Sequence, residues 1–107
     1  MTIHDVVLSG HLTAAQLSRE LGRLSFGPNA RAGLLVDCRE MTGYDPDARA
    51  LFVQWNRDHR RSIVGLAIVT DNALWSMVIR AMSLASAQQM RAWATAQDAR
   101  AWLGALR

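Results

Sequence analysis

Histidine and cysteine are the side chains here best suited to catalysis, and their spacing forms no recognised catalytic or metal-binding pattern. His4, His11 and His59 lie far apart and lack the spacing of metal ligands. Cys38 would act as a nucleophile only with a histidine beside it, and the sequence favours a small buried hydrophobic residue instead. The chain contains no phosphate-binding glycine loop and no GxSxG, HExxH or CxxC motif. We therefore expect no catalytic residue, no metal and no cofactor, as in a protein that is not an enzyme.

Polar residues gather where two predicted strands end. Asp37 and Arg39 end one apolar run, and Thr70 and Asp71 end another. In open α/β sheets, functional groups usually lie beyond the carboxyl ends of the strands. These residues, beside the loop 42–47, are therefore candidates for a site. An enzyme that combined the two carboxylates with Cys38 and a distant histidine is the less favoured alternative.

The elements that would position this edge alternate between strand and helix. A capping box at Thr13 and Gln16 predicts one helix start, and Asp45-Pro46 predicts another. Strands that alternate with helices indicate βαβ units and a mostly parallel sheet. We predict one small α/β domain over residues 1–107, with a four-stranded sheet and about four helices. The expected strands are 6–9, 34–38, 63–70 and 89–93, and the expected helices begin near residues 13, 45, 72 and 95.

Two carboxylates mark the start of the second predicted helix. Asp45 and Asp47 lie at the positive end of the helix dipole, where each stabilises by about 0.3–1 kcal/mol. We expect them to satisfy free backbone N–H groups, so that the helix start repels an external anion and attracts a partner bearing Arg or Lys. A helix start with no role beyond stability remains an equal alternative.

The segment Leu34 to Ala48 resembles the strand–loop–helix signature of STAS domains, and more closely the SpoIIAA-like branch, also described as STAS/SEC14-like. An apolar strand ends in Asp37, and a short loop leads to Asp45 at a helix start. The similarity continues through 63–75 and 99–103. The family usually begins with two strands, whereas this chain has room for about one before its first helix.

The resemblance implies a recognition surface at the start of the second helix. In bacterial anti-anti-sigma members that helix begins Asp-Ser-Ser-Gly, and a partner kinase phosphorylates the second Ser. Here Asp45, Pro46, Asp47 and Ala48 take those positions, so the phosphorylation switch cannot operate at Asp47. Thr42 carries a hydroxyl nearby, although the sequence does not single it out for modification.

The third predicted helix is apolar around well over half of its circumference, more than one buried face requires. We expect a homodimer or another partner contact through Trp75 and Ile79, and a merely deep helix is the alternative. The apolar surface that is not needed for one buried face would also suit an apolar ligand pocket near Trp75 and Met82, as the SEC14-like resemblance allows. The candidate partner-binding residues are Thr42, Tyr44, Asp45, Asp47, Trp75 and Ile79, and the candidate pocket residues are Asp37, Asp71, Trp75 and Met82.

Charge and composition limit the remaining possibilities. The 107 residues carry a formal charge of +3, and the run Arg57 to Arg61 favours a solvated helix end rather than a nucleic-acid site, because it lacks interleaved aromatic residues. No apolar run approaches the roughly 20 residues of a membrane span, and the single cysteine suits the reducing cytoplasm. The favoured function is a non-enzymatic regulatory module that binds a protein with a basic surface. The alternative is a carrier of a lipid or another small apolar molecule.

Overall fold

The computed structural model describes residues 1–106 and contains four strands and four helices in strict alternation. The elements are β1 (Thr2–Leu12), α1 (Ala14–Gly22), β2 (Ala32–Tyr44), α2 (Pro46–Asp58), β3 (Ile63–Val69), α3 (Ala73–Ser86), β4 (Met90–Trp93) and α4 (Ala96–Ala105). The predicted fold class is therefore confirmed, with one strand before the first helix.

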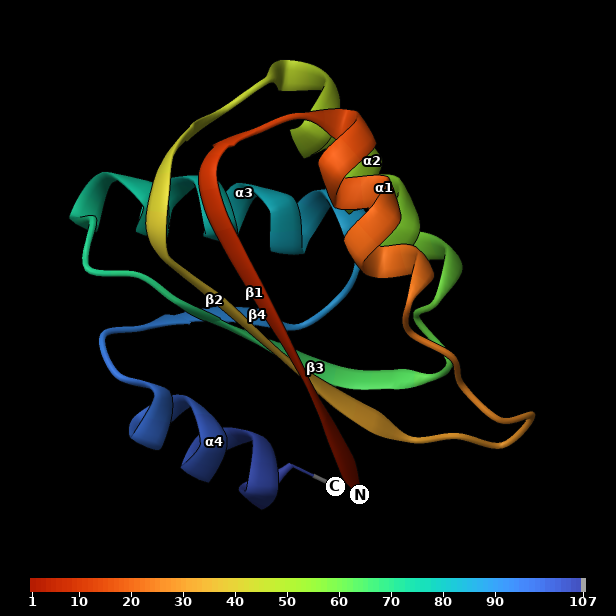
Figure 1. The fold of residues 1–107 in the computed structure, drawn as a ribbon. Helices are drawn as coiled ribbons and strands as arrows, with labels where there is room; N and C mark the ends of the chain where they lie inside the picture. The colour runs from red at the N-terminus through yellow and green to blue at the C-terminus, as the bar shows by residue number, and fades with distance from the viewer. Residues whose placement is uncertain (107) are drawn as a thin grey trace.

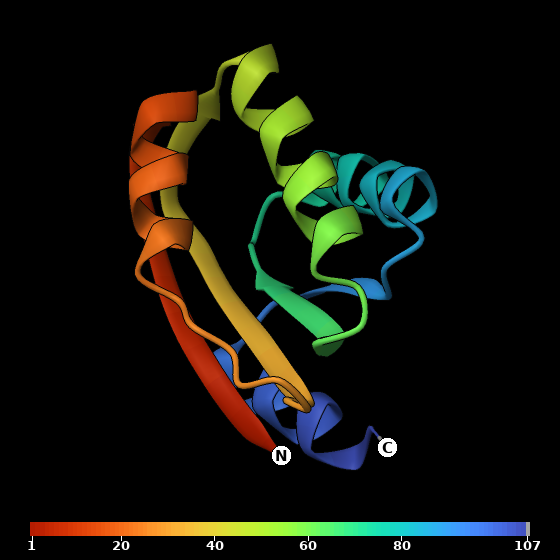
Figure 2. The same ribbon diagram turned by 90° about the vertical axis from the view of Figure 1, so that its right-hand side faces the viewer.

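The sheet is parallel throughout, and its strand order is β1-β2-β3-β4. Helices α1, α2 and α3 cover one face, and α4 alone covers the other (Figures 1 and 2). Because all three strand pairings are parallel, all four carboxyl ends point the same way. Asp37 lies within β2 rather than at its end, but it pairs in register with Val69, the last residue of β3, so Asp37 and the polar residues that follow β3 lie close together.

Strands β1 and β2 are longer than the apolar runs predict. The sequence analysis expected strands at 6–9 and 34–38, whereas pairing between these strands continues to Leu12 and Tyr44. Register shifts interrupt the ladder after Val7 and Gly10, and Gly10 has a positive φ of 68°. Polar residues interrupt the apolar pattern in the last part of both strands, but hydrogen bonding between the strand backbones does not require apolar side chains. The extension brings the end of β1 beside the start of α2.

The core has two parts, one on each face of the sheet. The larger part joins Leu17 of α1, Phe52 of α2 and Ile79 of α3 to the sheet, and the smaller part centres on Leu103 of α4. Gly33 lets α4 approach closely, since a Cβ there would come within 3.2 Å of Leu103. The central strands are buried on both faces, as the unbroken apolar run of β3 predicts.

Candidate functional site

The start of α2 is held by a link to β1. Asp45 is the N-cap residue, as predicted, but its carboxylate makes no capping hydrogen bond. Instead Asp45 Oδ1 lies 2.7 Å from His11 Nε2, and the Asp45 backbone N–H donates to Leu12 O at 2.9 Å. The expectation that Asp45 caps the helix through its side chain was therefore wrong. The β1 extension supplies a closer partner that the local sequence does not reveal.

The negative charge at this helix start remains accessible. The Asp45 side chain is 48% exposed, and Asp47 is exposed with no ion-pair partner among residues 1–106. Asp45 is the N-cap residue and Asp47 lies in the first turn of α2, where the helix dipole stabilises a negative charge. An approaching anion meets like charge, whereas a guanidinium or ammonium group is attracted.

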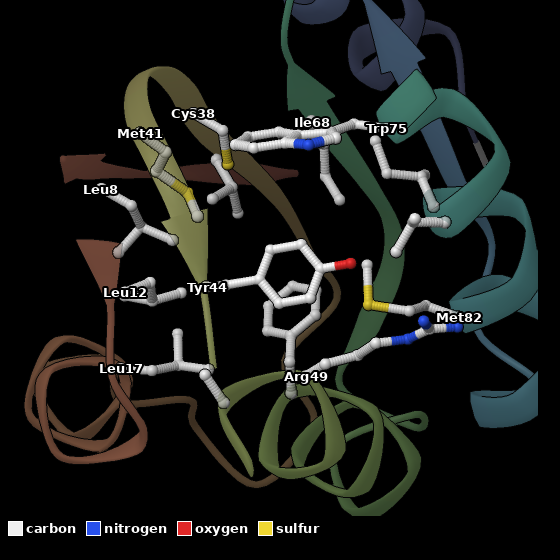
Figure 3. A pocket seen from close by; sticks show the side chains of 15 residues that line it. Leu8, Leu12, Leu17, Cys38, Met41, Tyr44, Arg49, Ile68, Trp75 and Met82 are labelled. Carbon is white, nitrogen blue, oxygen red and sulfur yellow. The ribbon is translucent and has the colours of Figure 1, made fainter. Parts of the chain in front are cut away.

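An apolar pocket lies next to these carboxylates, between α2, α3 and the sheet (Figure 3). Ala48 and Arg49, which follow Asp47 in the chain, belong to its wall. The full lining comprises Leu8, Leu12, Leu17, Val36, Cys38, Met41, Tyr44, Ala48, Arg49, Phe52, Ile68, Trp75, Val78, Ile79 and Met82.

Two aromatic rings stand over the pocket. Tyr44 and Trp75 meet edge to face with their ring centroids 6.1 Å apart, and both residues are half-buried. The Tyr44 hydroxyl points toward α3 in Figure 3, and the half-buried Arg49 lies below it. The cavity measures about 70 Å³. Since one water molecule occupies roughly 30 Å³ in the liquid, the space accommodates the end of one aliphatic side chain.

Cys38 lines this pocket but is poorly suited to nucleophilic catalysis. Burial raises the pKa of its thiol to about 12, and the neighbouring Asp37 carboxylate adds to the rise. The thiolate, which is the nucleophilic form, is therefore disfavoured at neutral pH. This agrees with the interpretation of Cys38 as a small buried hydrophobic residue.

The carboxylates at the sheet edge lie outside the pocket lining. Asp37 accepts two hydrogen bonds from the Arg39 guanidinium, at 2.7 and 3.0 Å, and these bonds lower the pKa of Asp37. The same hydrogen bonds to Asp37 raise the pKa of Arg39, and the charge of Asp71, which is exposed after β3, adds to that rise. Among residues 1–106, no three acidic, histidine or cysteine side chains are grouped to bind a metal ion.

The structure brings together four of the predicted site residues. Tyr44, Trp75, Ile79 and Met82 all line the pocket, and Asp45 and Asp47 flank it at the start of α2. Thr42 is exposed on β2.

Ile79, expected at a partner contact, is only 4% exposed and packs in the core. The large apolar side chains that α3 exposes are Leu74, Met77 and Leu84, at 73%, 74% and 79%.

Sequence reasoning did not single out Leu8, Leu12, Met41 or Arg49 as pocket residues. The helical spacing of Ala48 and Phe52 places them on one face of α2, and that spacing is a usable signal. The contribution of β1 had no such signal, because it depends on the long-range pairing of Leu12 with Tyr44.

Comparison with known proteins identifies the family and the fold of the chain. The family model described as SpoIIAA-like matches residues 3–104. The chain belongs to the SpoIIAA-like family. The crystal structure of an uncharacterised protein with a SpoIIAA-like fold from Shewanella loihica superposes with a TM-score of 0.72 at 17% identity, covering 92% of this chain and 82% of that one. Among curated proteins, no sequence matches. At this identity the likeness shows the fold alone.

No helix in the described part of this SpoIIAA-like chain has both the length and the apolar character needed to cross a membrane.

Proposed function

We propose that this SpoIIAA-like domain is a non-enzymatic protein-interaction module that acts in regulation. Its recognition surface combines the carboxylates at the start of α2 with the neighbouring apolar pocket. The observation that carries the proposal is the position of exposed Asp47 directly before Ala48 and Arg49, which line the pocket under Tyr44 and Trp75.

The partner is expected to present an apolar side chain next to an Arg or Lys. The cavity of about 70 Å³ holds the end of one such side chain, and Tyr44 and Trp75 are residue types that are enriched in interfaces. Asp45 and Asp47 then attract the basic group. Because Asp47 occupies the phosphoacceptor position of the related anti-anti-sigma proteins, we infer that the interaction is not switched by phosphorylation at that position.

The experiment is affinity purification from source-cell extract with wild type and the variant Asp45→Arg/Asp47→Arg. The matched control is Asp58→Arg/Asp98→Arg, which makes the same charge change at two other exposed carboxylates. We expect wild type and the control to recover a common partner that the first variant does not bind. If both double variants recover the same partners, or if wild type recovers none, the proposed surface is wrong.

The pocket contribution is tested separately with Trp75→Ala against the same purified partner. We expect weaker binding, seen as faster dissociation in surface plasmon resonance, while circular dichroism reports that the fold is retained. Unchanged affinity in a folded variant contradicts the use of the pocket.

Exposed apolar residues on α3 support a second contact, which we assign to another copy of this chain. Leu74, Met77 and Leu84 lie on a helix whose only charged residue is Arg80. Sedimentation of wild type is expected to give a dimer, and Met77→Glu/Leu84→Glu a monomer. If wild type stays monomeric at about 100 µM, its free energy of dimerisation is weaker than about −5.5 kcal/mol, and this pairing is ruled out.

The second candidate function is a carrier of a lipid or small apolar molecule. The apolar lining and the Arg49 guanidinium at its border favour an amphipathic anion. Ligand pockets usually measure about 300–1,000 Å³, so α2 and α3 would have to separate to admit such a molecule. Native mass spectrometry after gentle purification tests this function: a co-purified lipid supports it, and the mass of the protein alone argues against it.

A further inference from the structure

The sheet ends on one side in β1, a long strand with an open edge. β1 spans 11 residues and pairs only with β2, whereas β4, the strand at the other end of the sheet, spans 4. Among residues 1–106, the only backbone hydrogen bond that β1 forms outside the sheet joins Leu12 O to the Asp45 N–H. Figure 1 shows β1 in front of the other three strands. The outer side of β1 therefore presents a row of unpaired N–H and C=O groups.

The features that usually protect an edge strand are weak in β1. Proteins block such edges with short strands, with proline or with charged side chains, above all lysine. β1 contains no Pro, Lys, Arg or Glu, and its one acidic side chain, Asp5, lies 2.6 Å from the Arg100 guanidinium. The extra residues at both register shifts belong to β2, so β1 itself is disturbed only at Gly10, where φ is 68°. Residues 2–9 therefore remain regular and available for pairing.

The middle of β1 carries an exposed apolar side chain. Val6 and Leu8 are buried in the core beneath α1, α2 and α3, so strand alternation directs Val7 to the face on which α4 packs. The helix does not cover Val7, which is 60% exposed. A β-branched side chain on an added strand would pack against Val7, as cross-strand pairs do within a sheet.

Negative charge gathers at the Leu12 end of β1. Asp45 and Asp47 start α2 beside this end. Glu40, opposite Ser9 in the register, is exposed and forms no salt bridge among residues 1–106. An added antiparallel strand has its amino-terminal end here, and antiparallel pairing is slightly more stable per residue than parallel pairing. Charge complementarity therefore favours an incoming segment whose amino-terminal end is basic.

We propose that a partner protein adds an extended segment to β1 as a further, antiparallel strand, with Arg or Lys at the amino-terminal end of that segment. Main-chain hydrogen bonds to residues 2–9 hold the segment, and contacts with Val7 and the acidic end select it. The inference rests on the proposed function, since it takes Asp45 and Asp47 as the contacts of the basic group. A second copy of the chain fits less well, because β1 has no Arg or Lys to place at the acidic end of its neighbour.

The first measurement is amide hydrogen exchange, followed by NMR, with a synthetic peptide of Arg-Arg followed by Thr-Val repeats. Its length of about eight residues matches the regular part of β1. In the free protein we expect slow exchange at the alternate residues of 2–9 that bond to β2, and fast exchange at the residues between them. Saturating peptide should slow this second set about tenfold or more, because an added strand pairs their N–H groups. Amides of β4 are the control and should not change.

Fluorescence anisotropy of the labelled peptide compares variants. Val7→Glu should weaken binding about tenfold, although it adds attraction for the arginines, because a charge in the middle of an edge opposes strand addition. Ser76→Glu adds the same charge at an exposed position on α3 and should bind like wild type. Asp45→Arg/Asp47→Arg should remove the preference for this peptide over one with its arginines at the carboxyl end. Circular dichroism reports that each variant is folded.

Four results would overturn strand addition. These are no peptide binding up to about 1 mM, unchanged exchange in residues 2–9 at saturation, equal losses in Val7→Glu and Ser76→Glu, or a wild-type dimer that Val7→Glu converts to a monomer. The last result means that a second copy occupies the edge.

Failure of the proposed function gives a different pattern. If residues 2–9 become protected but wild type binds the two peptides equally, strand addition stands, and the basic end and the acidic surface at α2 are wrong. If Asp45→Arg/Asp47→Arg loses the natural partner while the partner leaves residues 2–9 unprotected, the acidic surface stands and strand addition is wrong.

Discussion

The reactivity of Cys38 offers the sharpest check of the pocket, because both the environment and the chemistry of its thiol are defined. Cys38 is 8% exposed and lines the pocket together with Leu8, Met41 and Ile68. Burial raises its pKa to about 12 from an ordinary value of 9.0. The thiolate fraction near pH 8 is therefore about a thousandfold lower than that of an exposed thiol.

The rate effect is smaller than the fall in thiolate, since a more basic thiolate is a better nucleophile. With a Brønsted coefficient of about 0.4–0.5, a rise of about three in pKa makes each thiolate roughly 20–30 times more reactive. The pKa alone thus predicts labelling about 30- to 50-fold slower than that of an exposed cysteine. A cavity of about 70 Å³ also admits no disulfide reagent, so restricted access slows the reaction further.

The assay is labelling of the native protein with an aromatic disulfide reagent at several pH values. The reference is Cys38→Ser/Ser18→Cys, which moves the thiol to an exposed position on α1. We expect the native Cys38 rate to be at least about 30-fold lower at pH 8 and to keep rising above pH 9, where the reference levels off. Labelling within a few-fold of the reference, or a plateau near pH 9, would refute the buried-thiol reasoning and reopen a catalytic role for Cys38.

Further predictions concern stability. Hydrogen bonds from Arg39 lower the pKa of Asp37. The stability that these bonds contribute is therefore present above about pH 4 and is lost as the pH falls through the lowered pKa of the native state. Urea unfolding at pH 7 and in acid should show that Asp37→Asn is destabilised only at the higher pH. Ala87 ends α3 with φ 56°, a conformation that favours glycine, so Ala87→Gly should stabilise by about 0.5–1 kcal/mol and raise the Tm in calorimetry, and a lower Tm contradicts this. Leu103→Ala should cost about 2–5 kcal/mol in urea unfolding, because this fully buried residue centres the α4 face. Leu84→Ala at a 79% exposed position should change stability by less than about 0.5 kcal/mol in dilute protein, where the proposed dimer dissociates. Equal costs for the two would contradict the assigned faces.

Local signals in the sequence determined the elements and their order. The Thr13 capping box forms as predicted, with Gln16 N–H donating to Thr13 Oγ1 at 3.2 Å, and α2 begins after Asp45 as its Asp-Pro start indicates. These signals operate within one helical turn, so they can be recognised without knowledge of the fold. The unbroken apolar run of β3 likewise indicated a central strand covered on both faces.

Tertiary structure alone decided which residues meet. His11 and Asp45 are 34 positions apart, and their contact depends on the register between β1 and β2, including two shifts that apolar patterning does not encode. The same register carries Leu12 into the pocket. The wide apolar surface of α3 left open which side faces inward, and packing placed Ile79 in the core and Leu84 outside. Composition and periodicity specify that a face is buried, whereas the partner across it is set by long-range pairing of strands and by the packing of helices on the sheet.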